Sequence, residues 1–460
     1  MKRRVLTEGP IGRQLLGLVA PMGFGIFAVM AFNLVDTWFV SLLGTEPLAA
    51  MSLTFPVVMV VGSLAMGLGV GATSVISRAI GGDGREEVRR LTTHALVLAA
   101  LVVVVVSVAG LAAIDPIFAS MGADEALLEL AREYMTVWFA GAACVVVPML
   151  GMSAIRATGD TRTPALVMTV AAVVNGVLDP IFIFGWGPVP AMGLRGAAVA
   201  TVLARAITLV VALWVLAVRE DLIGWRLYTR DFMDSCRRIL RIGGPAAGTN
   251  LALPLTVGFL TGLAASYGPE AVAAFGAGGR IEMFALIPVV ATGVGLAPFV
   301  GQNHGAGRDD RIAAALRLSF VATLGLGATS WLVLALLRAP LAGLFSDDAA
   351  VLPLLEQYLL VLPAAHLTAG GFFVSTHVLN ALGRPLPATA LTLLRAPVML
   401  AGGGWLGAQI AGLDGFFVGV AVGTLLTGLV GGLVVLPLWA GRKKGVSGRK
   451  KGVRPLGVRS

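Results

Sequence analysis

Charged residues are scarce in this chain of 460 residues, at 13%, whereas hydrophobic residues make up 57%. An ordinary soluble globular protein has about 25% charged residues, so this class is excluded. A nucleic-acid-binding protein is excluded as well, because no soluble domain remains to carry the net charge of +9 on a basic face. The only two cysteines, Cys144 and Cys236, lie far apart in an apolar run and in a basic segment. We therefore expect no structural disulfide.

Apolar runs that are long enough to cross a membrane recur along the whole sequence. A helix needs about 20 apolar residues to span a bilayer, whereas a barrel strand needs about 10. The lengths predict an all-α integral membrane protein with twelve transmembrane helices. The predicted spans are residues 15–42, 48–77, 91–114, 127–155, 164–185, 194–218, 240–266, 275–301, 312–337, 352–380, 387–411 and 415–440. No small-residue cleavage site follows the basic N-terminus, so we expect the first run to be retained as a helix rather than removed as a signal peptide.

The twelve spans form two halves of six that repeat each other. A constant offset of 224 residues pairs identical residue types: Pro21 with Pro245, Gly44 with Gly268, Ala49 with Ala273, Gly69 with Gly293, Gly81 with Gly305, Pro116 with Pro340, Asp124 with Asp348, Tyr134 with Tyr358 and Gly159 with Gly383. Because six is an even number, the halves have the same orientation and should be related by an axis along the membrane normal. We predict two pseudo-symmetric six-helix lobes at 1–218 and 240–440, a cytoplasmic linker at 219–239, and a basic, disordered tail at 441–460.

Basic and acidic residues are separated between the two sides of the predicted membrane protein. Most of the 34 Lys and Arg residues lie in the N-terminus, the C-terminal tail and the loops of one side. The loops of the other side carry mainly acids, such as Asp124, Glu125 and Asp347. The positive-inside rule therefore places both termini in the cytoplasm. We expect a multi-pass protein of the plasma membrane or the bacterial inner membrane.

Two lone acids lie inside predicted spans. Asp179 is the only charged residue of the apolar segment 164–184, and Asp36 is the only acid between residues 15 and 43. A carboxylate in a membrane span costs about 2.5–3.5 kcal/mol on insertion scales, so it usually faces a cavity or a partner and marks a functional site. Asn175 precedes Asp179 by four residues and would share its helix face. The alternative is an acid that ends a helix, because Pro180 follows Asp179.

Four polar side chains are expected at one depth in the first half. Asp36, Asp179, Tyr134 and Thr201 lie about six to eight residues from the outer ends of their spans, which is roughly 9–12 Å at 1.5 Å per residue. Polar groups from four helices at one level predict a pocket, and a chance coincidence of depth is the alternative. The offset partner of Asp36 is Leu260, so this acidic chemistry is confined to the first half.

Four motifs resemble those of the multidrug and toxic compound extrusion (MATE) transporters. They are Asn-Leu-Val-Asp-Thr-Trp-Phe-Val at 33–40 followed by Leu43-Gly44, Arg-Ala-Thr-Gly-Asp-Thr-Arg-Thr-Pro at 156–164, Asn-Gly-Val-Leu-Asp-Pro-Ile-Phe-Ile-Phe at 175–184, and Val-Gly-Gln-Asn-His-Gly-Ala-Gly at 300–307. The resemblance covers nearly all of the spans and loops. It implies a twelve-helix, two-lobed exporter that is coupled to the entry of protons or sodium ions. On the matching positions, it implies that the coupling ion is bound by Asp36, Asn175, Asp179, Thr201 and Tyr134.

The second half departs from the NorM-type branch of that family, because spans 7 and 10 contain no deep acid. The chain thus resembles the DinF-type branch. Glu282 is the one deep acid of the second half. It could form a structural pair with Arg280, two residues away, or it could contact substrate, for which Asn33 in the first span is another candidate.

Other intramembrane polar residues give weaker signals. His366 and His377 share a helix face, but two histidines without a nearby acid or cysteine favour packing or cavity lining over a metal site. We expect no metal and no cofactor other than the coupling ion. Arg205 could pair with an acid of the first half.

Pro21 lies fifteen residues before Asp36 and cannot donate a hydrogen bond to the carbonyl of Gly17. Because Gly23 and Gly25 follow, this turn should bend easily. We predict a kink near Pro21–Gly25 that acts as a hinge and changes when Asp36 is neutralised, as the resemblance also implies. The alternative is a fixed kink that serves packing, which the matching proline of the second half favours.

The leading functional interpretation is a secondary active antiporter that exports amphipathic, cationic organic compounds or drugs by alternating access, in exchange for protons or sodium ions. One alternative is a flippase of lipid-linked oligosaccharides or lipids from the same superfamily. An integral-membrane enzyme acting on lipid is disfavoured, because the cytoplasmic loops are too short and too ordinary to hold a catalytic site. We expect small organic substrates, contact with membrane lipid, no nucleic acid and a monomer.

Overall fold

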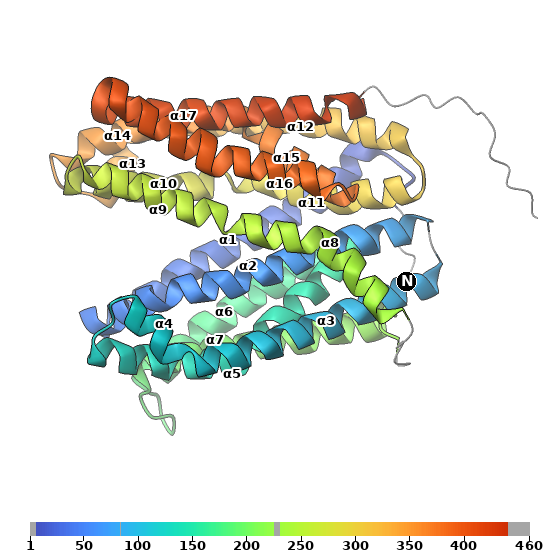
Figure 1. The fold of residues 1–460 in the computed structure, drawn as a ribbon, viewed down its shortest axis with the longest axis horizontal. Helices are drawn as coiled ribbons and strands as arrows, with labels where there is room; N and C mark the ends of the chain where they lie inside the picture. Colours follow the sequence, from blue (N-terminus) through green and yellow to red (C-terminus); the bar gives the residue numbers. More distant parts are fainter. Residues whose placement is uncertain (1–5, 83, 225–230, 440–460) are drawn as a thin grey trace, which may run out of the picture.

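The structure is a computed structural model that describes residues 6–82, 84–224 and 231–439. These residues are almost entirely helical, and a single isolated β-bridge among them joins Trp186 to Val189. Figure 1 shows long helices that run side by side in two lobes, with the N-terminus and the end of the last helix at the same end of the molecule. The predicted tail at 441–460 lies outside the described residues.

The first six spans follow the chain in order. They are α1 (Ile11–Ser41), α2 (Thr45–Gly82), α3 (Arg85–Ala112), α5 (Glu125–Ala157), α6 (Arg162–Phe184) and α7 (Gly193–Trp214), the last of which continues as the π-helix η1 (Val215–Arg219). A short helix, α4 (Ile114–Ser120), connects α3 to α5. These helices agree with the six predicted spans of the first half.

The spans of the second half are interrupted more often. The seventh is α8 (Phe232–Asn250) with α9 (Ala252–Ala265), and the eighth is α10 (Pro269–Ala285) with α11 (Ile287–Gly305). The ninth is α12 (Asp309–Leu336), followed by the short helix α13 (Arg338–Phe345). The tenth consists of α14 (Val351–Val361), the 3₁₀-helix η2 (Leu362–Ala365) and α15 (His366–Ala381). The last two are formed by α16 (Pro385–Leu393), the π-helix η3 (Leu394–Ala401) and α17 (Gly402–Trp439).

The number of spans follows from these breaks. Within the described ranges, ten segments are long and apolar enough to cross a membrane, and the pair α10 and α11, bent by 46°, forms another span. One of the ten, Pro385–Leu438, has 54 residues and contains non-helical backbone at Ala411 and Gly412, so it forms two spans. The prediction of an all-α membrane protein with twelve helices in two lobes is confirmed.

The predicted linker is shorter than expected, because α8 begins at Phe232 and not at residue 240. The first turns of α8 are amphipathic, with Cys236 and Ile239 buried and Arg237 exposed. A search for apolar runs therefore missed this part of the helix. Cys236 and Ile239 belong to the core of the first lobe, whereas Leu260 of α9 belongs to a core of the second lobe.

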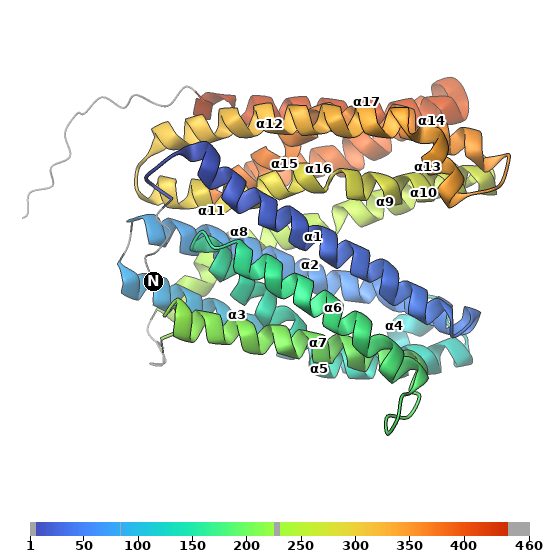
Figure 2. The ribbon, with the colours of Figure 1, turned by 180° about the vertical axis from the view of Figure 1, so that it is seen from behind.

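The seventh span thus begins in the first lobe and ends in the second, and α1 crosses between the lobes in the opposite direction. Leu15 and Leu18, near its start, pack with Phe299 and Ile312 of the second lobe, while Val40 near its end belongs to the core of the first lobe. Figure 2 shows α1 starting beside α11 and α12 and ending in the lower lobe. The first helix of each repeat thus begins against the other lobe.

The repeat is also visible in the backbone at paired glycines. Gly44 has φ of 113° and its offset partner Gly268 has φ of 109°, while Gly159 and Gly383 have φ of 88° and 72°. Such angles favour glycine, because a side chain would clash with the backbone. These glycine pairs therefore reflect equivalent turns in the two lobes.

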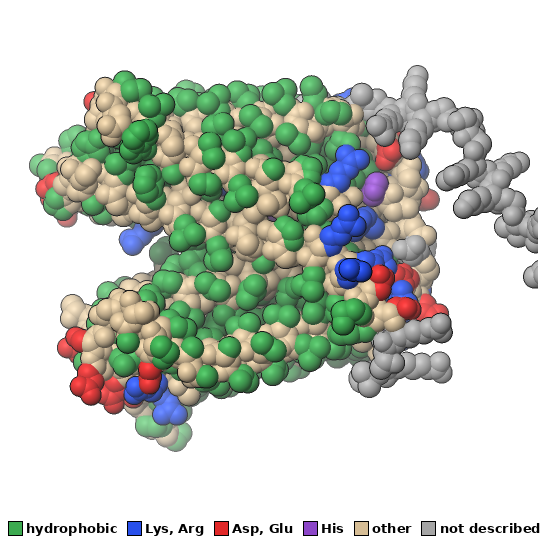
Figure 3. Space-filling model, in the orientation of Figure 1, with side chains coloured by type: hydrophobic (Ala, Val, Ile, Leu, Met, Phe, Trp, Pro, Cys, Tyr) green, Lys and Arg blue, Asp and Glu red, His purple; other side chains and the backbone are tan. Residues whose placement is uncertain are grey.

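The lobes are in close contact at the end that holds the N-terminus, where Figure 3 also shows Lys and Arg side chains; we call it the basic end. A Cβ atom at Gly81 of α2 would lie 2.0 Å from the carbonyl oxygen of Gln302 in α11, and one at Gly82 would lie 2.6 Å from that of Gly305. Ser74 of α2 donates a hydrogen bond to the carbonyl of Ala381 in α15. At the opposite end, Figure 3 shows the surface hollowed between the lobes. The cleft therefore opens away from the basic end.

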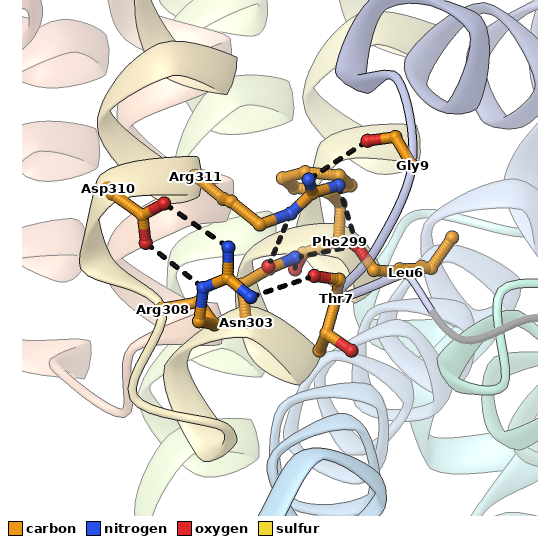
Figure 4. A network of polar contacts seen from close by, with 8 residues as sticks. All are labelled: Leu6, Thr7, Gly9, Phe299, Asn303, Arg308, Asp310 and Arg311. Atoms are coloured by element: carbon orange, nitrogen blue, oxygen red, sulfur yellow. Dashed lines mark hydrogen bonds and ion pairs between the residues drawn. The ribbon is translucent and has the colours of Figure 1, made fainter.

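Buried Arg311 of α12 ties the N-terminal segment to the basic end (Figure 4). Its guanidinium donates hydrogen bonds to the carbonyls of Gly9 and Leu6, at 2.9 and 3.1 Å, and lies 5.5 Å from the ring centroid of Phe299. The backbone N–H of Leu6 donates to the side chain of Gln302, which in turn donates to the carbonyl of Ala157 in the first lobe. The segment that precedes α1 thus connects both lobes.

Candidate functional site

Close packing of α1 against α6 positions the predicted acids. A Cβ atom at Gly25 of α1 would lie only 3.0 Å from the Cα atom of Ala165 in α6. Farther along, Gly176 of α6 leaves room for the ring of Phe32. Small residues let two membrane helices approach closely along their length. This approach brings Asp36 and Asp179 together at the end of the helices that is remote from the basic end.

The carboxyl groups of Asp36 and Asp179 lie within hydrogen-bonding reach of each other. Asp179 is fully buried, and its Oδ1 accepts a hydrogen bond of 2.8 Å from the side-chain amide of Asn175. Oδ1 of Asp36 and Oδ2 of Asp179 are both buried and have no donor among the described residues. A proton on either carboxyl group would supply the missing hydrogen bond between them.

The electrostatics of this pair favour one bound positive charge. Two carboxylates at hydrogen-bonding distance in an apolar environment do not both remain ionised. The proton that they hold then belongs to the pair rather than to one residue. The arrangement can therefore bind a proton, or a small cation that replaces it. Among the described residues, no group of three or more His, Cys, Asp or Glu side chains is placed to hold a metal ion.

The other predicted residues of the first half differ in how they are placed relative to the two acids. Tyr134 of α5 is buried and close enough to interact electrostatically with both Asp36 and Asp179. Thr201 of α7 is half-buried, and no hydrogen bond joins it to either acid within the part of the chain that is described. The side chain of Asn33 is exposed on α1, one turn from Asp36. The structure thus brings together Asp36, Asp179, Asn175 and Tyr134.

A second cluster of polar side chains lies in the second lobe, and the sequence analysis did not find it as a cluster. Oε2 of Glu282 accepts a hydrogen bond of 2.6 Å from the hydroxyl of Tyr358, and its Oε1 lies 3.2 Å from Nε2 of His366. The other ring nitrogen of His366 lies 2.9 Å from the hydroxyl of Ser330. These four residues come from α10, α12, α14 and α15. We refer to them as the Glu282 cluster.

The partner suggested for Glu282 by its sequence neighbourhood is wrong. Arg280 is exposed, and no ion pair joins it to Glu282 in the described ranges. Residues two apart in a helix point in different directions, so nearness in sequence is a poor guide here. The offset of 224 already pointed to Tyr358, because its counterpart Tyr134 also interacts electrostatically with acids.

The remaining intramembrane candidates have other partners or none. His377 contacts the carbonyl of Phe373 in its own helix, at 2.8 Å. Arg205 forms no ion pair with an acid of the first lobe among the described residues. Of the residues singled out from the sequence, the Asp36–Asp179 pair and Glu282 with its partners are therefore the ones placed to hold an ion or a polar substrate.

In this conformation α1 is not broken near Pro21, where the kink is predicted. α1 is one continuous helix from Ile11 to Ser41, and Figure 2 shows no sharp bend along it. The reason lies in the carbonyl of Gly17, which Pro21 deprives of its helical donor. The hydroxyl of Thr161, just before α6, donates a hydrogen bond of 3.3 Å to that carbonyl. A donor from a neighbouring segment thus replaces the missing one.

The fold and these sites define a twelve-helix, two-lobed membrane protein built on an internal repeat. The chain belongs to the MatE family, whose model matches residues 21–181 and again residues 245–405. The two matches are 224 residues apart, the offset found in the sequence. Since this is a family of transporters, the chain is a transporter and not an enzyme. The family prediction is confirmed, whereas the DinF-type branch stays a prediction.

Relatives of known name extend over nearly the whole chain. A protein of Shewanella oneidensis named FAD transporter is 37% identical over 428 residues, which cover 93% of this chain and 95% of that protein. The probable multidrug resistance protein NorM of Thermotoga maritima is 27% identical and covers 84% of this chain and 83% of its own. The crystal structure of the Vibrio cholerae MATE transporter VcmN in the bent form has a TM-score of 0.89 at 32% identity, covering 94% of this chain and 97% of that one.

Proposed function

We propose that this chain is a secondary active antiporter that exports amphipathic organic compounds and is driven by protons bound at the Asp36–Asp179 pair. The observation that carries the proposal is the meeting of two carboxyl groups from α1 and α6, each with a buried oxygen that has no donor among the described residues. Taking up one proton would remove a charge from the membrane interior and complete a hydrogen bond. The pair is therefore suited to binding and releasing a proton.

The proposed orientation of the molecule would place this pair toward the outside. Basic residues at the end where α1 begins and α17 ends support a cytoplasmic location for that end. The cleft between the lobes then opens to the outside, and its closed end faces the cytoplasm. A proton that enters from outside would neutralise the pair, and rearrangement of the lobes would expose it to the cytoplasm. Sodium is the second candidate for the coupling ion, since two carboxylates could also bind it.

Two classes of substrate are supported by different relatives. The relative named FAD transporter, with 37% identity, favours an anionic flavin nucleotide. The relative named as a multidrug resistance protein, with 27% identity, favours the cationic drugs expected from the sequence. Both classes are aromatic and amphipathic, and the higher identity leads us to place the flavin nucleotide first. The lipid flippase considered above stays an untested alternative.

The test uses the full-length protein in liposomes with an imposed pH gradient or an imposed sodium gradient. FAD and the aromatic cation ethidium serve as probes of the two substrate classes. We expect a pH gradient to drive uptake of at least one probe against the concentration gradient of that probe. Asp36→Asn should reduce this uptake to the level of empty liposomes, because an amide cannot release a proton.

Thr37→Ala is the matched control, since Thr37 is exposed beside Asp36 and its hydroxyl bonds, among the described residues, to the carbonyl of Asn33 in its own helix. Gradient-driven uptake by this variant should equal that of the wild type. Full activity of Asp36→Asn would remove the pair from the coupling mechanism. A response to sodium alone would assign sodium as the coupling ion and overturn the proton assignment.

A further inference from the structure

The helices of the second lobe break where their counterparts in the first lobe are continuous. By the repeat, α1, α2, α5 and α6 correspond to the seventh, eighth, tenth and eleventh spans, and each of these four is a single helix. Their counterparts are interrupted at Leu251, Leu286, Leu362–Ala365 and Leu394–Ala401. Broken helices within a membrane protein are tolerated where they line a cavity, and in transporters such breaks occur at substrate sites near the middle of the bilayer.

Charged and aromatic side chains of the second lobe lie at these breaks. Glu282 is three residues before the end of α10, where the chain bends by 46°. His366 begins α15 directly after the 3₁₀ segment, and Arg395 is the second residue of the π-helix η3. π-helical and 3₁₀ segments inside longer helices occur frequently at functional sites and hinges. Three independent breaks therefore converge on Arg395 and the Glu282 cluster.

Arg395 and Glu282 differ in whether their polar atoms have hydrogen-bond partners. Both oxygens of Glu282 already have partners, Tyr358 and His366. The Arg395 guanidinium stacks 4.5 Å above the ring centroid of Phe372 and 5.3 Å from that of Phe373, and it interacts electrostatically with Glu282. No hydrogen bond or ion pair occupies its N–H groups in the part of the chain that the structure describes. Five donors in a fixed planar arrangement are thus available to a ligand.

We propose that Arg395 binds a phosphate group of an aromatic, anionic substrate, with the Glu282 cluster and the two phenylalanines forming the surrounding site. Guanidinium and phosphate match in charge and in bidentate geometry, whereas a cationic ligand would be repelled by Arg395. Glu282 stabilises the guanidinium in the membrane through its negative charge. Tyr358 and His366 occupy both oxygens of Glu282, so these oxygens do not take up the N–H groups of Arg395. This inference rests on the proposed export function and assigns its substrate contact to the second lobe.

The test measures equilibrium binding of FAD, FMN and riboflavin to the purified full-length protein by the change in flavin fluorescence. Riboflavin has the same ring system without phosphate, so its affinity reports the part of binding that does not depend on Arg395. We expect the wild type to bind FMN and FAD more tightly than riboflavin. Arg395→Gln should weaken FMN binding roughly 10- to 100-fold, as expected for a lost charge-assisted hydrogen bond, and should leave riboflavin unchanged.

Arg395→Lys, which keeps the charge but loses the planar donors, should bind FMN with intermediate affinity. Arg280→Gln is the control, since it removes an exposed arginine from the helix that carries Glu282 and should change neither affinity. Inorganic pyrophosphate should compete with FMN on the wild type, which keeps the proposal testable if Arg395→Gln does not fold.

Two outcomes would overturn the proposal. The first is equal affinity of the wild type for FMN and riboflavin, together with competition by phosphatidylglycerol, which would assign Arg395 to a lipid headgroup. The second is FMN binding that is unchanged in Arg395→Gln. Gradient-driven uptake in liposomes is measured separately, so its absence would count against the antiporter and not against this binding site.

Discussion

At the scale of single residues, Asn175 decides which oxygens of the acid pair remain open. Its amide occupies Oδ1 of Asp179, which leaves Oδ2 without a donor beside Asp36. A shared proton would then lie between two defined oxygen atoms. The stability of the folded protein should consequently depend on whether that proton is present.

We expect wild-type protein in detergent to become less stable as the pH rises, because the folded pair holds a proton that the unfolded chain has already lost. The slope for one such proton is at most about 1.4 kcal/mol per pH unit. Asp179→Asn removes the repulsion between the carboxylates and should flatten this slope. Thermal unfolding followed by tryptophan fluorescence at a series of pH values measures both slopes. An unchanged slope in Asp179→Asn would show that the pair holds no proton in the folded protein.

The first-lobe acids could be predicted because a lone charge in an apolar span is conspicuous in any sequence. The Glu282 cluster could not be assembled in the same way, since Tyr358 and His366 lie 76 and 84 positions from Glu282. Neither Tyr358 nor His366 indicates by itself which acid it contacts. Only the packing of four helices shows that Glu282, Tyr358 and His366 are in contact. The repeat did, however, align Tyr358 with Tyr134.

At the scale of helices, Thr161 helps to explain why α1 is continuous although it contains Pro21. Its hydroxyl occupies the carbonyl of Gly17, the group that a bend at Pro21 would otherwise turn toward water or another donor. Sequence analysis could predict the weak point of the helix from Pro21 itself. It could not predict the donor, because Thr161 is 144 residues away.

Thr161→Val should remove that donor and favour a bent α1. Losing one hydrogen bond of about 1 kcal/mol would change the ratio of straight to bent molecules about fivefold. Spin labels on the outer half of α1 and on α6 would report this as a shift in their distance distribution. Thr158→Val is the control, because the hydroxyl of Thr158, just after α5, bonds locally to the carbonyl of Ile155 at the end of that helix. If both variants give the wild-type distribution, Thr161 does not control the bend.

At the scale of the whole molecule, backbone contacts without intervening side chains close the basic end. The twelve spans, the two lobes and the repeat could all be predicted from the apolar runs and the offset of 224. The cleft and its direction could not, because helices of the same sequence can pack with either end of the lobes apart. Contacts such as that of Gly81 with Gln302 belong to one conformation only.

Gly81→Ala should therefore separate the lobes at the basic end, because the added methyl group would lie 2.0 Å from the carbonyl oxygen of Gln302. Spin labels at Arg85 and Leu386, in a background without Cys144 and Cys236, should move apart relative to the wild type. Gly62→Ala is the control in the same helix, since nothing lies within 4 Å of its Cβ position. Equal distances in both variants would mean that the contact at Gly81 does not hold this end closed.

The crossing of α1 between the lobes has a consequence for biosynthesis. The chain is made from its N-terminus, and domains of a protein generally begin to fold in that order. Leu15 and Leu18, however, pack against Phe299 and Ile312, which are synthesised about 280 to 300 residues later. The first helix to enter the membrane must wait, with this face covered only by lipid or by assisting proteins, until the second lobe has been inserted. A nascent chain released after its first six spans would therefore hold α1 incompletely packed.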